Sequence, residues 1–270
     1  MKVRVITALI GLTILIFIIY YGGWFMYFMA SIFGLIGFME FTKAVNKKID
    51  ISSIVTAVFI PITFLVLYMG RHDLLIAVFF GIIIANMICL VVKFEDLSIY
   101  NISVNLFSYF YTAFTFAILV YIRSMDSGIL YLLPIFISAF MSDTFAYFVG
   151  RAIGKRKLSP KLSPNKTVEG SIGGIFMSAL VVMFYFTYFH QVFDFKSNEL
   201  TFVWCLGYFV AGALAAGMSQ IGDLFASAIK RKCDIKDFGK LMPGHGGVVD
   251  RFDSVFMITP IYLVLYMFLH

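Results

Sequence analysis

Charged residues are scarce in this chain of 270 amino acids: they make up 13% of it, whereas 61% is hydrophobic. Soluble domains carry about 25% charged and roughly 45–50% apolar residues, so the composition excludes a water-soluble globular enzyme. The shortage of polar residues also excludes intrinsic disorder. Three cysteines are too few for a disulfide scaffold. With 32 Phe and 15 Tyr spread along its length, most of the chain must contact lipid.

Hydrophobic windows long enough to cross a bilayer, about 20 residues each, recur along the whole chain. Because lipid offers the backbone no hydrogen-bond partners, we expect the windows to be α-helical, and the alternating pattern of an outer-membrane barrel is absent. No small-residue cleavage site follows the first window, so we expect it to be retained. The sequence predicts an all-α polytopic membrane protein of about nine transmembrane helices. The windows cover residues 5–21, 23–38, 51–69, 74–92, 106–122, 129–149, 172–189, 201–226 and 254–269.

The basic residues divide unevenly between alternate loops. If the N-terminus is cytoplasmic, all of the 21 Lys and Arg except Arg71, Arg123 and Lys196 fall on the cytoplasmic side. This asymmetry predicts a cytoplasmic N-terminus and an outside C-terminus. Attraction to anionic lipid, together with this topology, accounts for most individual lysines.

The chain shows no internal repeat, low-complexity tract or long polar insertion. We therefore expect a single membrane domain over residues 1–270. Its N-terminal spans, residues 1–128, would be mainly scaffold, and residues 129–270 would form the catalytic half. A homodimer is compatible with first spans that carry no chemistry, and no nucleic-acid partner is expected.

Two acids, Asp143 and Asp223, lie at or near membrane depth. An ionised carboxylate there is costly unless it is paired, hydrated or metal-bound, so each position is a functional hypothesis. On a helix, Asp223, Ser227 and Lys230 share one face. The alternatives are an acid that reaches interfacial water and a stripe of small residues that lets helices approach closely. The small residues would not explain the acid.

A glycine-rich run, residues 243–249, opens into the last hydrophobic window. Three Gly and one Pro exclude a helix interior and free backbone N–H groups for close contacts, and His245 is held between two of the glycines. Asp250 and Asp253 would share one face of the following helix. Facing Asp223, they would form an oxygen-rich site suited to Mg²⁺, although helix capping accounts easily for one of them.

Residues 151–166 combine six basic residues with two Ser-Pro turns. The segment fits an ordinary cytoplasmic loop and also a lid that grips phosphates. Acids for a metal and cations on the same membrane side together indicate phosphoryl-group chemistry on a lipid.

Several segments match a known signature. The chain resembles the phosphatidate cytidylyltransferases, also called CDP-diacylglycerol synthases, over roughly its C-terminal half, with Asn165 where that family often has Lys. The segments that carry the resemblance are 143–147, 150–151, 163–170, 227–231, 236–237, 243–247 and 250–253.

The resemblance implies that CTP and phosphatidate react to give CDP-diacylglycerol and pyrophosphate, with Mg²⁺, on the cytoplasmic side of the inner membrane. The number of divalent cations, one or two, and a second cation type are left open. The expected metal ligands are Asp223, Asp250 and Asp253, and Lys230 and His245 join them as catalytic residues. The expected contacts to substrate phosphates are Lys166, Ser227, Lys230, Arg231, Lys236, Gly246, Gly247 and Arg251, with Asp143 and Asp237 in support.

Two rival functions stand beside this one. An ion-coupled transporter would use Asp143 and Asp223 on a crossing path and would need paired broken helices at the midplane. A CTP-dependent lipid kinase would transfer the γ-phosphate to an alcohol, and the signature at 250–253 argues against it.

Overall fold

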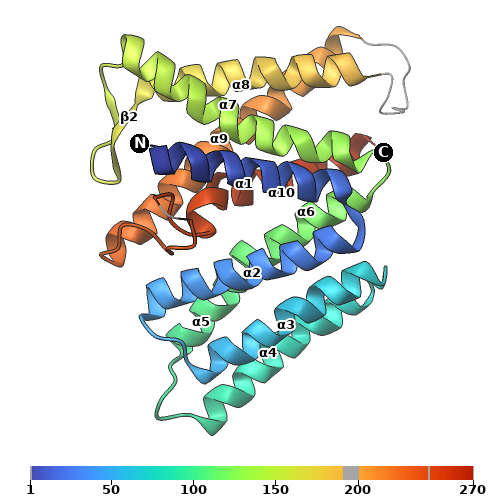
Figure 1. Cartoon of the computed structure of the whole chain (residues 1–270), viewed down its shortest axis with the longest axis vertical. Helices are drawn as coiled ribbons and strands as arrows, with labels where there is room; N and C mark the ends of the chain where they lie inside the picture. Colours follow the sequence, from blue (N-terminus) through green and yellow to red (C-terminus); the bar gives the residue numbers. More distant parts are fainter. Residues whose placement is uncertain (1, 191–200, 243, 270) are drawn as a thin grey trace. The chain divides into compact units, whose positions relative to one another are not determined.

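The computed structural model describes residues 2–190, 201–242 and 244–269 (Figure 1). Lys196 and Pro243, which entered the topology and loop predictions, lie outside the described residues. The helices are α1 (Lys2–Tyr21), α2 (Gly23–Asn46), α3 (Ile51–Tyr68), α4 (Leu74–Val92), α5 (Ile99–Ser108), α6 (Thr115–Ser124), α7 (Gly128–Ile153), α8 (Val168–Phe189), α9 (Phe202–Lys232) and α10 (Val249–Leu269), and a π-helical segment, η1 (Tyr109–Phe114), joins α5 to α6.

The predicted all-α polytopic membrane fold is confirmed. Over the described part of the chain, eight helices are long and apolar enough to cross a membrane, with α5, η1 and α6 counting as one span. The first predicted window falls on α1, whose apolar part, Leu9–Tyr21, is shorter. The side of the membrane on which each terminus lies stays a prediction.

The chain divides into two compact units. The first unit holds Met1–Ser124 and Lys232–Phe252, and the second holds Met125–Arg231 and Asp253–His270. The functional division expected at residue 128 stays a prediction. The glycine-rich loop, however, belongs to the same unit as the N-terminal spans.

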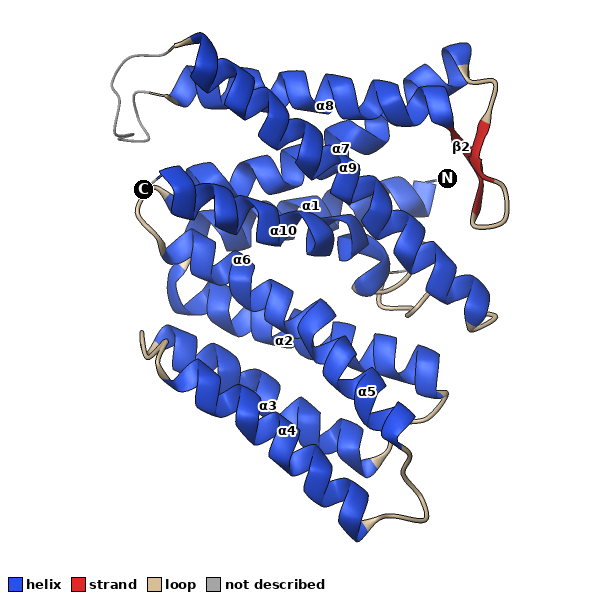
Figure 2. Ribbon diagram, turned by 180° about the vertical axis from the view of Figure 1, so that it is seen from behind, coloured by secondary structure: helices blue, strands red, loops and turns tan. Residues whose placement is uncertain are grey.

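In the first unit, α2, α3 and α4 lie side by side (Figure 2). Gly34 of α2 packs so tightly against η1 that a Cβ there would lie 3.1 Å from the Ala113 Cα. The buried hydroxyls of Thr63 and Tyr109 are 2.5 Å apart, so each has a partner away from water. Helix α3 begins after Asp50, whose carboxylate accepts the Ser53 N–H at 2.8 Å. The Thr63 and Tyr109 hydroxyls are thus paired, which avoids the cost of burying an unbonded polar group.

In the second unit, α7 and α8 lie side by side and are joined by a hairpin (Figures 1 and 2). Gly174 makes the close approach possible, because a Cβ there would lie 2.6 Å from the Ser142 carbonyl oxygen. Strands β1 (Lys157–Ser159) and β2 (Ser163–Thr167) pair antiparallel. The basic segment expected to be a loop or a lid is therefore an ordered hairpin. The Thr167 hydroxyl accepts the Gly170 N–H at 3.1 Å and starts α8 directly after β2.

Candidate active site

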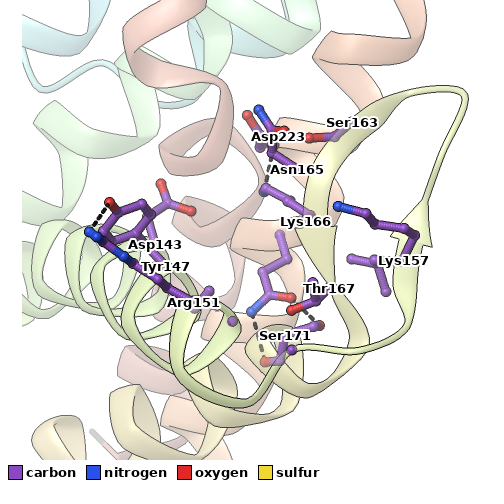
Figure 3. Close-up of a pocket in the computed structure, with 15 residues that line it drawn as sticks. Asp143, Tyr147, Arg151, Lys157, Ser163, Asn165, Lys166, Thr167, Ser171 and Asp223 are labelled. Atoms are coloured by element: carbon purple, nitrogen blue, oxygen red, sulfur yellow. Dashed lines mark hydrogen bonds and ion pairs between the residues drawn. The ribbon is translucent and has the colours of Figure 1, made fainter.

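A pocket of about 610 Å³ opens in the second unit, between the end of α7, the hairpin and α9 (Figure 3). Its size suits a polar molecule with several phosphates or a lipid headgroup. The residues that line it are Asp143, Ala146, Tyr147, Gly150, Arg151, Gly154, Lys157, Leu158, Ser163, Asn165, Lys166, Thr167, Ser171, Gln220 and Asp223.

Charges of both signs line this pocket. The Lys166 ammonium lies 2.5 Å from Asp223 Oδ2, and the two side chains are only 25% and 31% exposed. The hairpin contributes Lys157, and α7 contributes Asp143 and Arg151 (Figure 3). This combination of carboxylates and cations can bind a metal ion and neutralise phosphates in the same place.

Neutral polar side chains join α7, α8 and α9 by hydrogen bonds at the pocket. Gln220 of α9 accepts a hydrogen bond from the Ser171 hydroxyl of α8 and donates to Ser142 Oγ of α7 at 3.1 Å. Its amide also donates to the Ser171 carbonyl at 3.1 Å. Because Gln220 is only 5% exposed, these bonds form in a low dielectric and fix the relative positions of α7, α8 and α9.

Asp253, on the part of α10 that belongs to the second unit, is buried, with 8% of its surface exposed. Its Oδ1 accepts the Ser254 N–H at 2.7 Å, and it lies within electrostatic range of Asp223, Lys230 and Asp143. Helix α9 approaches α10 closely here, because a Cβ at Gly222 would lie 2.5 Å from the Asp253 carbonyl oxygen. The second unit therefore brings together three of the predicted acids and two of the predicted lysines.

Asp250 belongs to the first unit and has a different environment. Its Oδ2 accepts the N–H groups of Phe238 at 2.8 Å and of Gly247 at 3.0 Å. A Cβ on Gly246, whose φ is 81°, would lie 2.7 Å from the same oxygen. The structure shows Asp250 as a carboxylate that holds the glycine-rich loop, an extension of the capping alternative. Its role as a metal ligand stays a prediction.

The remaining predicted residues divide between the two units. His245 Nδ1 lies 2.7 Å from the Thr7 hydroxyl of α1, and Gly247 is buried against α2. Ser227 lies one turn after Asp223 on α9, half-buried. Four predicted residues of the signature are exposed to solvent: Arg231 in the second unit, and Lys236, Asp237 and Arg251 in the first.

The residues of the second unit fit a divalent cation in part. Among the described residues, no group of three or more His, Cys, Asp or Glu side chains is placed to hold a metal ion. Mg²⁺ in phosphoryl-transfer sites is usually held by one or two carboxylates, with water and substrate phosphates completing its shell. Asp223 and Asp253 lie within electrostatic range of each other, so they meet this requirement for one or two carboxylates.

Sequence reasoning missed several residues. Tyr147, Lys157, Ser171 and Gln220 line the pocket without having been singled out for a role. Glu40 of α2 was also missed, although it accepts the Val249 N–H at 3.1 Å. One signal was present, because Glu40 is the first acidic residue of the chain and follows directly on an apolar window.

Known proteins are similar to this chain along its whole length. A sequence model described as the cytidylyltransferase family matches residues 2–269. The chain belongs to this family. It is 33% identical to a phosphatidate cytidylyltransferase of Staphylococcus aureus (strain COL), and the match covers 98% of each chain. The phosphatidate cytidylyltransferase of Staphylococcus haemolyticus (strain JCSC1435) is 34% identical, again over 98% of each chain. The family match thus extends beyond the C-terminal signature to the N-terminal spans.

Proposed function

We propose that the protein is an integral-membrane enzyme that transfers the cytidylyl group of CTP to phosphatidate, giving CDP-diacylglycerol and pyrophosphate. The observation that carries the proposal is the pocket of the second unit, where Asp143 and Asp223 meet Lys166, Lys157 and Arg151. Its relatives of similar length, aligned from end to end, carry the name phosphatidate cytidylyltransferase.

In the proposed reaction, an oxygen of the lipid phosphate attacks the α-phosphorus of CTP in line. A new P–O bond forms as the bond between the α-phosphorus and the bridging oxygen to the β-phosphate breaks, and pyrophosphate leaves with the electron pair. The lipid phosphate is already ionised at neutral pH, so no protein nucleophile is required. Catalysis then depends on positioning and on neutralising charge.

The cations of the second unit supply that neutralisation. Lys166 is paired with Asp223, so a bound phosphate would compete with Asp223 for its ammonium. Lys157 and Arg151 lie on the opposite walls of the pocket and would contact the remaining phosphate oxygens (Figure 3). Lys230 lies near Asp253, where it would balance the acids.

We propose that Asp223 and Asp253 hold Mg²⁺, with Asp143 in support. The cation would supply Lewis-acid stabilisation of the negative charge on the transferring phosphoryl group. This assignment needs only the two acids whose proximity within one unit is described above.

We also propose that the site faces the cytoplasm, with the N-terminus on the same side and the C-terminus outside. In support, Cys233, which directly follows α9 and precedes the glycine-rich loop, lies within electrostatic range of Lys47, which follows α2. Phe238 of that loop stacks on Phe41, close to the basic end of α2. The positive-inside rule puts such an end in the cytoplasm. Residence in the inner membrane and a homodimer belong to the same proposal.

Purified protein incubated with CTP, Mg²⁺ and phosphatidate in mixed micelles tests the function. We expect pyrophosphate and CDP-diacylglycerol in equal amounts. Dolichol in place of phosphatidate should give neither CDP nor a phosphorylated lipid. Release of CDP with dolichol would favour the lipid kinase. No nucleotide turnover, combined with ion flux in sealed vesicles, would favour the transporter.

A further inference from the structure

The Glu40 carboxylate of α2 contacts the glycine-rich loop and a glycine that precedes it. Glu40 lies near the end of α2, and its Oε2 accepts the N–H of Val249, the first residue of α10, at 3.1 Å. A Cβ added to Gly239 or to Gly247 would collide with the same carboxylate. Glu40 therefore occupies a space that exists because both residues lack a side chain. All four residues belong to the first unit.

The two limbs of the loop, residues 238–239 and 247–249, are held together by two carboxylates. Glu40 packs against Gly239 on one limb and against Gly247 and Val249 on the other. Asp250 Oδ2 joins the same limbs, because it accepts the N–H of Phe238 and that of Gly247. We name residues 238–239 and 247–249, together with these two carboxylates, the loop clamp.

The start of α10 offers hydrogen-bond donors to a carboxylate. The N–H groups at the start of α10 have no partner within the helix, and the helix dipole makes this end positive. The Glu40 carboxylate lies at this positive end of α10, although the nearby charge of Asp250 disfavours a second negative charge there. The Glu40 carboxylate fits between the two glycines and accepts the Val249 N–H, so the shape of the loop and one hydrogen bond define its position.

We propose that Glu40 is a positioning residue for the cytidylyl transfer: it fixes the backbone of residues 238–239 and 247–249 and thereby the first turn of α10. The proposal rests on the proposed function for its kinetic consequence. It assigns a role in the reaction to a residue of the N-terminal spans, outside every segment that carries the family signature.

The first test compares Glu40→Ala, Glu40→Gln and Glu95→Ala, the last removing an exposed carboxylate of the same unit. For Glu40→Ala we expect kcat to fall at least about tenfold and the KM for CTP to change less than about threefold, because the loop loses its shape while the phosphate-binding pocket of the second unit is untouched. Glu40→Gln keeps the size and one acceptor oxygen, so it should recover most of the lost kcat. Glu95→Ala should behave as wild type.

Limited digestion with trypsin measures how accessible the loop is, since Lys236 and Lys240 are exposed on either side of residues 238–239. Cleavage after these residues should be at least about fivefold faster in Glu40→Ala than in wild type, and near wild type in Glu40→Gln. Unchanged cleavage and unchanged kcat in Glu40→Ala would overturn the proposal. So would a Gln variant that is no better than Ala, because the hydrogen bond to Val249 would then not matter.

A double-mutant cycle with Gly239→Ala tests the contact itself. Gly239 has no positive φ, so alanine fits its backbone, but the new methyl group must displace the Glu40 carboxylate. Gly239→Ala alone should lower kcat at least about fivefold and speed cleavage of the loop. Added to Glu40→Ala, it should cost less than about twofold. Fully additive effects would overturn the assignment.

Two further outcomes are covered. If Glu40→Ala fails to fold, Gly239→Ala and Glu40→Gln decide the question with the same two measurements. If wild type makes no CDP-diacylglycerol, the proposed function fails, whereas the digestion rates still show whether Glu40 holds the loop.

Discussion

The two units use carboxylates in different ways. In the first unit, Glu40, Asp50 and Asp250 accept backbone N–H groups and hold a loop or a helix start in place. In the second unit, Asp223 pairs with Lys166 and lines an open pocket, and Asp253 lies near Lys230. An acid that lines a pocket and an acid that shapes the backbone therefore cannot be told apart by their place in the sequence alone. The hydrogen-bond partners of the acid make that distinction.

This contrast has a consequence for the three aspartates of the predicted metal site. Asp250 and Asp253 are one helical turn apart on α10, yet one holds the loop clamp and the other lies among the charges of α9. A short signature can thus serve two physical tasks at once. Variants on the two sides should fail in different ways.

The largest effect is expected for Asp223→Asn. The change removes the partner of Lys166 and a proposed cation ligand but keeps the shape of the side chain, so kcat should fall by about a thousandfold or more. The rate of trypsin cleavage after Lys240 should not change, because the loop clamp is intact. Asp126→Asn, at an exposed acid of the same unit, is the matched control. Turnover near the wild-type rate would remove Asp223 from the site.

A smaller effect is expected for Thr7→Val on α1. The change removes the hydroxyl that lies 2.7 Å from His245 Nδ1 but keeps the volume, so kcat should fall about two- to fivefold as the histidine loses its orientation. Thr13→Val is the control, because the Thr13 hydroxyl donates to the Leu9 carbonyl of its own helix. Equal rates for both variants would show that α1 does not orient His245.

The smallest effect on turnover is expected for Asp50→Ala, which should leave kcat unchanged and lower the free energy of unfolding by about 1 kcal/mol through loss of the α3 cap. Thermal unfolding of the detergent-solubilised protein measures it. Asp73→Ala is the control, because Asp73 precedes α4 without a side-chain capping bond and its ion pair with Arg71 is exposed, so its removal should change the stability less than Asp50→Ala does.

The stabilising effect of Asp50 should depend on pH. Burial raises the pKa of Asp50, but hydrogen bonds from Ser52 and Ser53 outweigh it and hold the pKa below its ordinary value of 3.8. A lowered folded-state pKa gives stability that is present above the unfolded pKa and is lost as the pH falls through the folded one. The difference in Tm between wild type and Asp50→Ala should therefore be constant from pH 7 to 5 and shrink below pH 3.8. A difference that grew on acidification would contradict the assignment.

The helices could be predicted because hydrophobic length alone determines a span in lipid. The glycine-rich loop was also predictable, since its glycines exclude a helix. The hairpin of residues 157–167 was not, because two Ser-Pro turns fit a loop as well as paired strands. Nor was the division of labour between Asp250 and Asp253, because a spacing of three residues gives a shared face and no partners.

The sequence by itself determined that this protein is a helical membrane protein, because that depends on composition. It also determined that acids and cations are concentrated in and near the C-terminal signature, because that depends on local spacing. Only the tertiary structure decided what each acid contacts. Glu40 and Val249 are 209 positions apart, and no local pattern links them. The contact exists because α2 packs against a loop whose glycines leave room for a carboxylate, and such a fit depends on shape in three dimensions.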